Sequence, residues 1–179
     1  RKQRPGRPAP ETTVNLLQEV ALAMQIHPEG RQVQMNRHGA AQILVPEHRD
    51  RSEDSPLVWA ERFLEQEELD SGIVVRRGDD LRFWHLTFQE FLAARAIAAR
   101  DDAQQRQILS MSAKDGGALR LYESEWREMV LLLAGVLYHH GHRRVDRLFE
   151  MVLDQLPDDA TLEARARCFA LLGAAVQDL

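Results

Sequence analysis

The sequence predicts a mainly α-helical protein with one small β-hairpin. Along most of the chain, apolar residues recur every three or four positions, the spacing of helices that bury one face. Residues 73–85, in contrast, alternate apolar and polar side chains on both sides of an Arg-Gly-Asp-Asp turn, as two short paired strands do. Strands this short and few cannot form a core sheet, so we expect the helices to supply the core.

The first part of the chain is predicted to contain two helices and a short strand. Residues 1–12 are expected to form a linker, because proline and glycine interrupt a run of basic residues. A first helix is expected over 14–26, with Thr12 or Thr13 as its N-cap. Residues 31–34 are expected to supply a short strand. Asn36 is placed to cap a second helix that ends before Pro46.

The next elements complete a recognisable order. The charged segment 48–56 is expected to be a mobile loop, followed by a third helix at 57–69 that buries Val58, Phe63 and Leu64. The strands of the hairpin are expected at 73–76 and 81–85. Helix, short strand, helix, helix and hairpin is the order of a winged helix, a helix-turn-helix variant with a β-wing.

The run from Leu81 to Arg95 changes from the period of a strand to that of a helix. Thr87 and Glu90 have the spacing of a capping box at the start of this helix, which is expected over 88–99. His85 then lies just before a helix N-terminus, where free amides and the helix dipole favour an anion. The residues alone leave two interpretations open: a histidine that holds a phosphate, or a half-buried histidine at a strand end.

The same run resembles a signature of NACHT-type STAND ATPases, the group that contains the NOD-like receptors and their bacterial relatives. The matching residues are Phe83-x-His85-x-Thr87-Phe88-Gln89-Glu90-Phe91-x-Ala93-Ala94. Segments 71–74 and 126–135 also match the family in order and spacing, so the resemblance extends over residues 13–135.

The resemblance implies a regulatory module of such an ATPase. In the family, the winged helix folds back on the nucleotide-binding domain of the same polypeptide, and the histidine of the motif contacts the β-phosphate of bound ADP. This role transfers to His85 and to no other residue. The complete protein would use ADP and ATP with Mg²⁺, self-oligomerise on nucleotide exchange and activate an effector in defence signalling, whereas the chain alone would hold no cofactor.

The other residues of the motif are given structural roles. Thr87 and Glu90 are assigned to capping. Gln89 is left open, with a polar contact to a neighbouring domain as one possibility. The apolar residues are expected to pack the helix onto the hairpin: Phe83, Phe88, Phe91 and Leu92.

The rest of the chain is predicted to be helical, with helices over 103–113, 125–140, 143–156 and 161–176. We therefore expect a winged-helix domain over 13–100 and a helical domain over 101–179, the possible start of a HEAT-like repeat array, although no internal period is visible. Trp126 is expected to be a core anchor, and Cys168 a small buried hydrophobe. The histidines at 139, 140 and 142 lie at a helix C-terminus without a completing cysteine or carboxylate, so no metal site is expected.

Composition limits the function. With 44% hydrophobic and 28% charged residues, the chain is typical of a folded soluble protein. The longest apolar run, 129–138, is too short to span a bilayer, and no signal peptide is visible. A single cysteine fits a reducing compartment. A cytoplasmic location without membrane contact is therefore expected. A start without Met in a linker predicts a fragment of a longer protein. The chain has no phosphate loop, nucleophile elbow, zinc motif or C-x-x-C pair, so no catalysis is expected from it alone.

Two other functions are compatible with parts of the sequence. The main alternative is a winged-helix DNA-binding transcription regulator with a helical partner domain. The third helix opposes it, because it carries five carboxylates against Arg62, and DNA phosphates repel such a surface. A net charge of −5 also argues against a nucleic-acid partner. The last possibility, an unrelated helical scaffold, requires the signature to be a coincidence.

Overall fold

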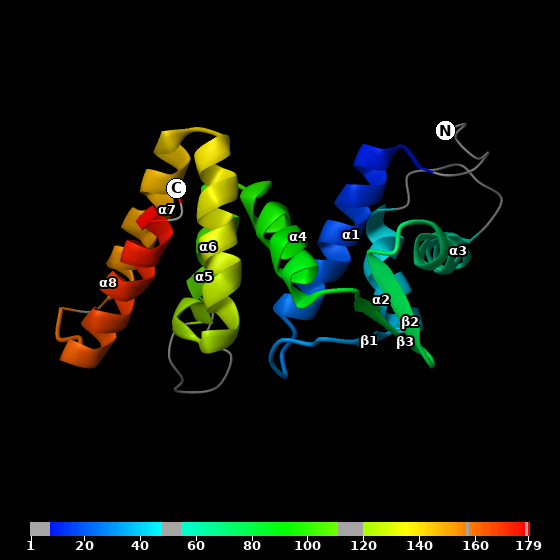
Figure 1. The fold of residues 1–179 in the computed structure, drawn as a ribbon, viewed down its shortest axis with the longest axis horizontal. Helices are drawn as coiled ribbons and strands as arrows, with labels where there is room; N and C mark the ends of the chain where they lie inside the picture. The colour runs from blue at the N-terminus through cyan, green and yellow to red at the C-terminus, as the bar shows by residue number, and fades with distance from the viewer. Residues whose placement is uncertain (1–7, 48–54, 111–119, 157, 178) are drawn as a thin grey trace. The chain divides into compact units, whose positions relative to one another are not determined.

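A computed structural model of the chain describes residues 8–47, 55–110, 120–156, 158–177 and 179. The chain divides into two compact units, residues 1–93 and 94–179. It is mainly helical (73%) with a small three-stranded antiparallel sheet, which confirms the predicted fold class (Figure 1). Most of the expected loop at 48–56 and residues 1–7 of the expected linker lie outside the described residues.

The first unit has the element order of a winged helix. Its elements are α1 (Pro10–Gln25), β1 (Met35–Asn36), α2 (Arg37–Leu44), the 3₁₀ helix η1 (Val45–Glu47), α3 (Pro56–Asp70), β2 (Val74–Arg77), β3 (Asp80–Phe83) and the first residues of α4 (Leu86–Ala98). The three strands pair in the order β1-β3-β2, all antiparallel. Helix α2 contacts both α1 and α3, so the three helices pack as one cluster beside the sheet (Figure 1).

Local signals explain where the helices of this unit begin. The Asn36 side chain accepts a hydrogen bond from the amide of His38 at 3.0 Å, which confirms Asn36 as the N-cap of α2. The prediction for α1 was wrong by four residues, because the helix begins at Pro10 and Thr13 is buried inside it. Proline suits the first helical turn, where its fixed φ is helical and its missing N–H has no partner to lose.

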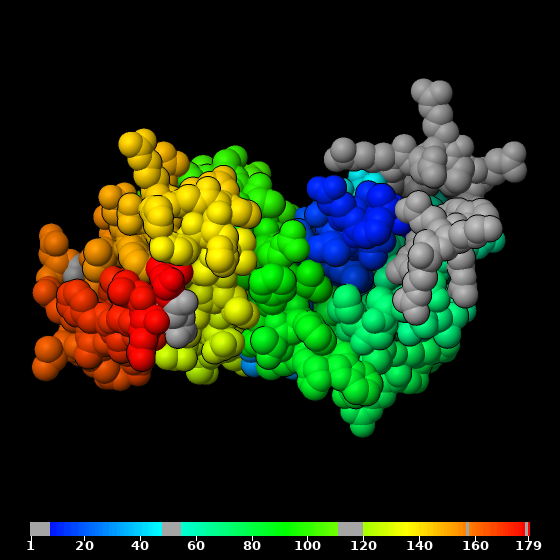
Figure 2. All heavy atoms as spheres, turned by 45° about the horizontal axis from the view of Figure 1, so that its top comes forward, coloured from blue at the N-terminus to red at the C-terminus, as the bar shows by residue number. Residues whose placement is uncertain are grey.

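The hairpin forms within two residues of the predicted strand limits: β2 is shifted by one residue, and β3 begins one residue earlier and ends two residues earlier than expected. β2 and β3 are joined by Gly78 and Asp79, and Gly78 has φ +66°, the left-handed conformation that glycine allows at the first position of a two-residue hairpin loop. The last bond of the pairing runs from the amide of Trp84 to the carbonyl oxygen of Ile73 at 2.8 Å. Residues 76–79 at the end of the hairpin are exposed and belong to the surface in Figure 2.

The strand expected at 31–34 was placed too early. β1 is Met35–Asn36, and Met35 lies opposite Leu81 of β3. Gln32 does not join the sheet, because its backbone amide donates to the carbonyl oxygen of Met24 at 2.9 Å. The neighbouring Arg31 guanidinium binds Glu90.

The core of the first unit combines one face of each helix with alternate residues of the hairpin. Phe63 and Leu64 of α3 are buried as predicted, but Val58 is 39% exposed, because it lies only two residues beyond the start of α3, at its outer end. The other buried apolar residues of α1, α2 and the strands are Leu16, Leu17, Val20, Ala21, Leu22, Met24, Ala40, Ala41, Leu44, Val74, Leu81 and Phe83.

The described part of the second unit consists of helices. They are the end of α4, α5 (Asp102–Ser110), the 3₁₀ helix η2 (Arg120–Tyr122), α6 (Ser124–His139), α7 (His142–Asp154) and α8 (Leu162–Gln177). Gly141, with φ +130°, forms the tight turn between α6 and α7. Helix α6 contacts α7, α8 and η2, which makes it the centre of this unit, as its apolar surface predicts.

Trp126 near the start of α6 is 1% exposed, so the prediction of a core anchor is confirmed. Cys168 is fully buried, as a small hydrophobe would be. Two ion pairs join α5 to α7 at the surface, Arg147 to Asp102 at 2.7 Å and Arg106 to Asp154 at 3.2 Å. Exposed pairs of this kind contribute little stability, so apolar packing around Trp126 holds the unit together.

Candidate functional site

His85 lies between the end of β3 and the first residue of α4. Its carbonyl oxygen accepts a hydrogen bond from the amide of Phe88 at 3.1 Å, so His85 occupies the cap position of the helix. Its side chain is exposed. The sequence therefore placed His85 correctly at a helix N-terminus. Its exposure does not agree with the alternative of a half-buried histidine at a strand end.

The capping box predicted from Thr87 and Glu90 is wrong. Helix α4 begins at Leu86, so Thr87 lies inside the first turn and cannot be its N-cap. The carboxylate of Glu90 accepts a hydrogen bond from Arg31 Nη1 at 2.8 Å, in an ion pair whose side chains are only 17% and 5% exposed. An unpaired buried charge destabilises a protein far more than an uncapped helix terminus does, so the Glu90 carboxylate binds a cation and not the end of the helix.

The apolar residues of the motif divide into a buried and an exposed set. Phe83 and Leu92 are 4% and 7% exposed, as expected for residues that pack the helix onto the hairpin. Phe88 and Phe91, for which the same role was predicted, are 43% and 39% exposed. The prediction failed for them because a helix buries only one side, and Leu92 and Ala93 already occupy the inner side of α4.

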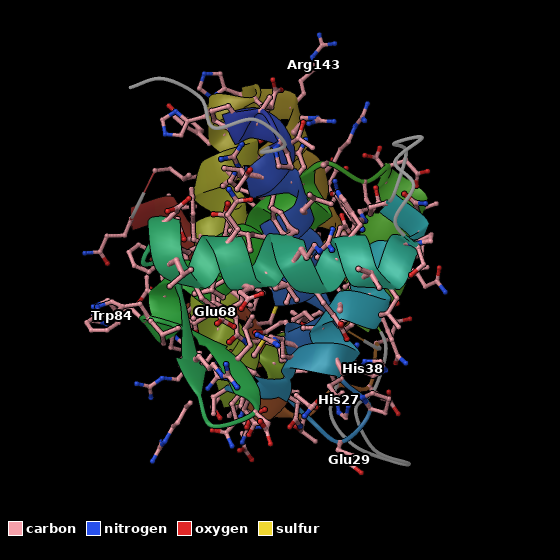
Figure 3. All side chains as sticks on the ribbon, turned by 90° about the vertical axis from the view of Figure 1, so that its right-hand side faces the viewer. His27, Glu29, His38, Glu68, Trp84 and Arg143 are labelled. Atoms are coloured by element: carbon pink, nitrogen blue, oxygen red, sulfur yellow. The ribbon has the colours of Figure 1, made fainter. Side chains whose placement is uncertain are left out.

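Two exposed aromatic rings lie beside the imidazole of His85. The ring centroid of His85 lies 5.9 Å from that of Trp84 and 5.8 Å from that of Phe88. Figure 3 shows Trp84 pointing outward from the unit, and it is 56% exposed. Leu86 and Phe91 in the first two turns of α4 are also exposed, at 38% and 39%. These five residues, Trp84, His85, Leu86, Phe88 and Phe91, are called here the His85 surface. Clustered exposed apolar side chains of this kind mark interaction sites, whereas single ones do not.

The chemistry of the His85 surface suits an anion held against a neighbouring protein surface. The first amides of α4 and the positive end of its dipole lie at His85, and both favour negative charge. An exposed imidazole can donate a hydrogen bond to an oxygen of such an anion. Once a partner covers the aromatic rings, the contact is shielded from water and becomes stronger.

Gln89 is the residue of the motif whose role the sequence left open. Its side chain is 1% exposed, and its Nε2 donates to the carbonyl oxygen of Gln32 at 2.8 Å. The contact therefore lies within the first unit. No signal in the sequence could have shown it, because the two residues are 57 positions apart.

The structure gives no support to recognition of DNA by α3. Glu65 and Asp70 are exposed on this helix, and Glu68, labelled in Figure 3, is half-buried. Glu61 contacts His38 Nδ1 at 2.9 Å, and only Glu67 is fully buried. At the wing, Arg76 donates to the carbonyl oxygen of Gly78 at 2.7 Å. Carboxylates therefore lie on the exposed side of α3, and carboxylates repel phosphates.

The histidines near the end of α6 do not form a metal site with other described residues. Within the described residues, no three His, Cys, Asp or Glu side chains are arranged to hold a metal ion. His142 instead contacts the ring of Tyr138, with centroids 4.5 Å apart, and His140 Nδ1 lies 3.4 Å from Arg144 Nη1.

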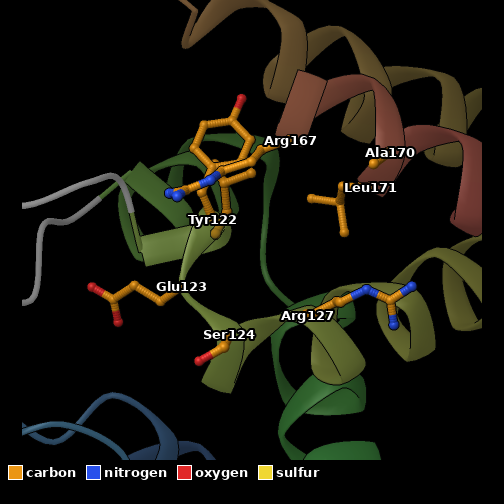
Figure 4. Close-up of a pocket in the computed structure, with 8 residues that line it drawn as sticks. Tyr122, Glu123, Ser124, Arg127, Arg167, Ala170 and Leu171 are labelled. Atoms are coloured by element: carbon orange, nitrogen blue, oxygen red, sulfur yellow. The ribbon is translucent and has the colours of Figure 1, made fainter. Parts of the chain in front are cut away.

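A pocket of about 190 Å³ opens beside the start of α6, and the sequence gave no signal of it (Figure 4). Its lining is mostly apolar, with Arg127 and Arg167 at the edge. Their guanidinium groups point in opposite directions, and Arg167 forms an ion pair with Glu163. The two cations therefore do not converge on a common anion.

The order of elements and the sheet define the first unit as a winged-helix domain. A family described as "Winged helix-turn-helix domain C-terminal to NACHT" matches residues 5–97, more than half of the chain. The chain therefore belongs to this family of winged-helix domains that follow NACHT domains, and this confirms the resemblance drawn from the motif. No curated protein and no solved structure gives a significant match.

Membership in this family implies a nucleotide-binding parent protein and suggests packing of the domain against the NACHT domain. No P-loop domain is detected in the 179 residues. None of the helices that the structure describes combines the length and the apolar character needed to cross a bilayer.

Proposed function

We propose that the chain is the regulatory winged-helix and helical module of a NACHT-type signal-transduction ATPase. In this proposal the winged-helix domain, over residues 13–100, packs against the nucleotide-binding domain of the same polypeptide in the resting, ADP-bound state. The helices of residues 101–179 form the start of a helical repeat array. They relay both the opening driven by ATP and the self-oligomerisation that follows. The complete protein acts in defence signalling in the cytoplasm. Neither nucleic acid nor a membrane is a partner.

One observation carries the proposal: an exposed imidazole at the N-terminus of α4 with two exposed aromatic rings, Trp84 and Phe88, beside it. We assign to His85 a hydrogen bond to the β-phosphate of ADP. The nucleotide and its Mg²⁺ are held by the nucleotide-binding domain, and the His85 surface supplies the apolar contact between the two domains. This contact explains why Leu86 and Phe88 are apolar at positions that are exposed in this chain.

The proposed contact is strong enough to act as a switch. A hydrogen bond to a charged group contributes about 1.5–3 kcal/mol. If it forms only in the closed arrangement, it shifts the ratio of closed to open protein by about 10- to 150-fold. Replacing ADP by ATP and rearranging the domains removes the contact, so the open form becomes populated.

The test is the dissociation rate of ADP from the complete protein. His85→Ala is expected to raise this rate by about 10- to 150-fold, because the lost contact stabilises the bound state by that factor. It is also expected to raise basal activity. His140→Ala is the matched control, since it removes an exposed histidine from the second unit. An ADP dissociation rate that is the same in His85→Ala as in the natural protein rejects the proposal.

A further inference from the structure

Two buried polar residues follow the exposed Phe88 in helix α4. Gln89 and Glu90 are 1% and 4% exposed. Both bind the loop between α1 and β1: Gln89 Nε2 donates to the carbonyl oxygen of Gln32 at 2.8 Å, and Glu90 accepts from Arg31 Nη1 at 2.8 Å. We call these four residues the clasp.

The loop that the clasp holds is itself fixed. The amide of Gln32 donates to the carbonyl oxygen of Met24 near the end of α1 at 2.9 Å, and its side chain donates to the carbonyl oxygen of Gly30 at 2.9 Å. The clasp therefore ties α4 to the end of α1 through segments that are 57 and 59 residues apart in sequence. It does so about one helical turn from His85, since Gln89 is four positions further along.

The polar nature of the clasp needs an explanation beyond stability. A buried ion pair is usually no more stabilising than apolar side chains of similar volume, because both charges lose their hydration. Directed hydrogen bonds, however, fix the rotation and axial position of a helix, whereas apolar contact is non-directional. Fixed orientation matters most where a side chain must meet a particular atom, and 1 Å of displacement is enough to lose such a contact.

We infer that Gln89 and Glu90, held by Gln32 and Arg31, are positioning residues for His85. They do not touch the nucleotide. They set the orientation of the first turn of α4, and with it the direction in which the imidazole points. This inference rests on the proposed function and deepens it, because it makes retention of ADP depend on an ion pair within the winged-helix domain.

The test compares two ways of removing the ion pair. Glu90→Gln removes the negative charge that the partly buried Arg31 guanidinium contacts, so it is expected to lower Tm. It is also expected to raise the dissociation rate of ADP from the complete protein by about 2- to 30-fold, the range for residues that act at a distance. The double variant Arg31→Met with Glu90→Leu replaces both charges by apolar groups. It is expected to restore Tm while the dissociation rate stays raised, because the direction of the contact is not restored.

A second readout separates the clasp from the proposed contact with ADP. In the 179-residue chain, the backbone ¹⁵N relaxation of His85 and the ¹H–¹³C signals of its ring are expected to show greater motion in both clasp variants. Glu163→Gln, which breaks an exposed ion pair in α8, is the matched control and should leave these signals unchanged. If the double variant restores both Tm and the ordered signals of His85, the clasp is merely structural and the inference is overturned. If the His85 signals change but His85→Ala does not affect ADP, the clasp stands and the proposed phosphate contact fails.

Discussion

Trp126→Ala is the substitution that most directly tests the packing of the second unit. The indole is 1% exposed, and Trp126 lies at the start of α6, the helix that contacts α7, α8 and η2. The guanidinium carbon of Arg120 lies 5.2 Å from the ring centroid, and the Arg120 side chain is itself buried. The substitution therefore empties a large space and also removes the face on which a buried cation rests.

The expected loss of stability can be worked from these facts. A tryptophan side chain buries about 150–250 Å², and at about 25 cal/mol per Å² this corresponds to roughly 4–6 kcal/mol. Measured losses for a large aromatic residue replaced by alanine are about 3–5 kcal/mol, since neighbouring side chains partly fill the cavity. Burial lowers the pKa of Arg120, more than Glu123 raises it, so its charge is already poorly solvated and the loss of the ring makes this worse. We expect a decrease of about 3–5 kcal/mol.

The measurement is urea unfolding of the 179-residue chain followed by circular dichroism. Trp84→Ala is the matched control, because it makes the same chemical change at a residue that is 56% exposed, and it should cost less than about 1 kcal/mol. A decrease below about 1 kcal/mol for Trp126→Ala, equal to that of the control, would falsify the assignment of Trp126 as the anchor of this core.

Three smaller predictions concern single interactions. Asn36→Ala is expected to cost about 1 kcal/mol in urea unfolding, because the amide of His38 loses its cap, and a loss of zero would mean that water replaces the cap fully. Gly78→Ala should cost about 1–2 kcal/mol, and this cost comes from its φ of +66° alone, because the added Cβ would touch no other atom. Gly173→Ala, in an open position of α8, should instead stabilise the chain by about 0.5–1 kcal/mol. Changes of the same sign in the two variants would contradict this. Burial and a hydrogen bond to Cys168 raise the pKa of Tyr122 above its ordinary 10.0, so its contribution to stability is complete below pH 10.0 and is lost as pH rises through the higher folded pKa. Between pH 8 and 11 the free energy of unfolding should therefore fall less in Tyr122→Phe than in the natural chain. Parallel pH dependences of the two free energies would refute this prediction.

Signals within a few residues predicted much of this protein. The Asn36 cap, the glycine of the hairpin loop and the change of period at 81–95 all depend on neighbours within one or two turns, and the structure has each of them. The apolar surface of α6 and the burial of Trp126 could be predicted for the same reason. The errors at these elements are small shifts of strand and helix limits, where local preferences are weakest.

The errors at the candidate site have another origin. Thr87 and Glu90 match a capping box by spacing, yet Glu90 binds Arg31, 59 residues away. The exposure of Phe88 and the internal contact of Gln89 were equally invisible, because the choice between an inner and an outer side depends on which segments meet in space.

The sequence by itself determined the kinds of element, their order and the place of His85 before a helix, because backbone preferences, caps and turns act between near neighbours. Only the tertiary structure decided which hydrogen-bond or ion-pair partner each buried polar group has. It buried the carboxylate of Glu90 against a distant guanidinium and left aromatic rings exposed around the imidazole. The physical reason is that a buried charge or amide is stable only with a hydrogen-bond partner, which can come from any part of the chain that folding brings close. Clustered exposed aromatic rings, in contrast, mark a surface where another protein surface can bind.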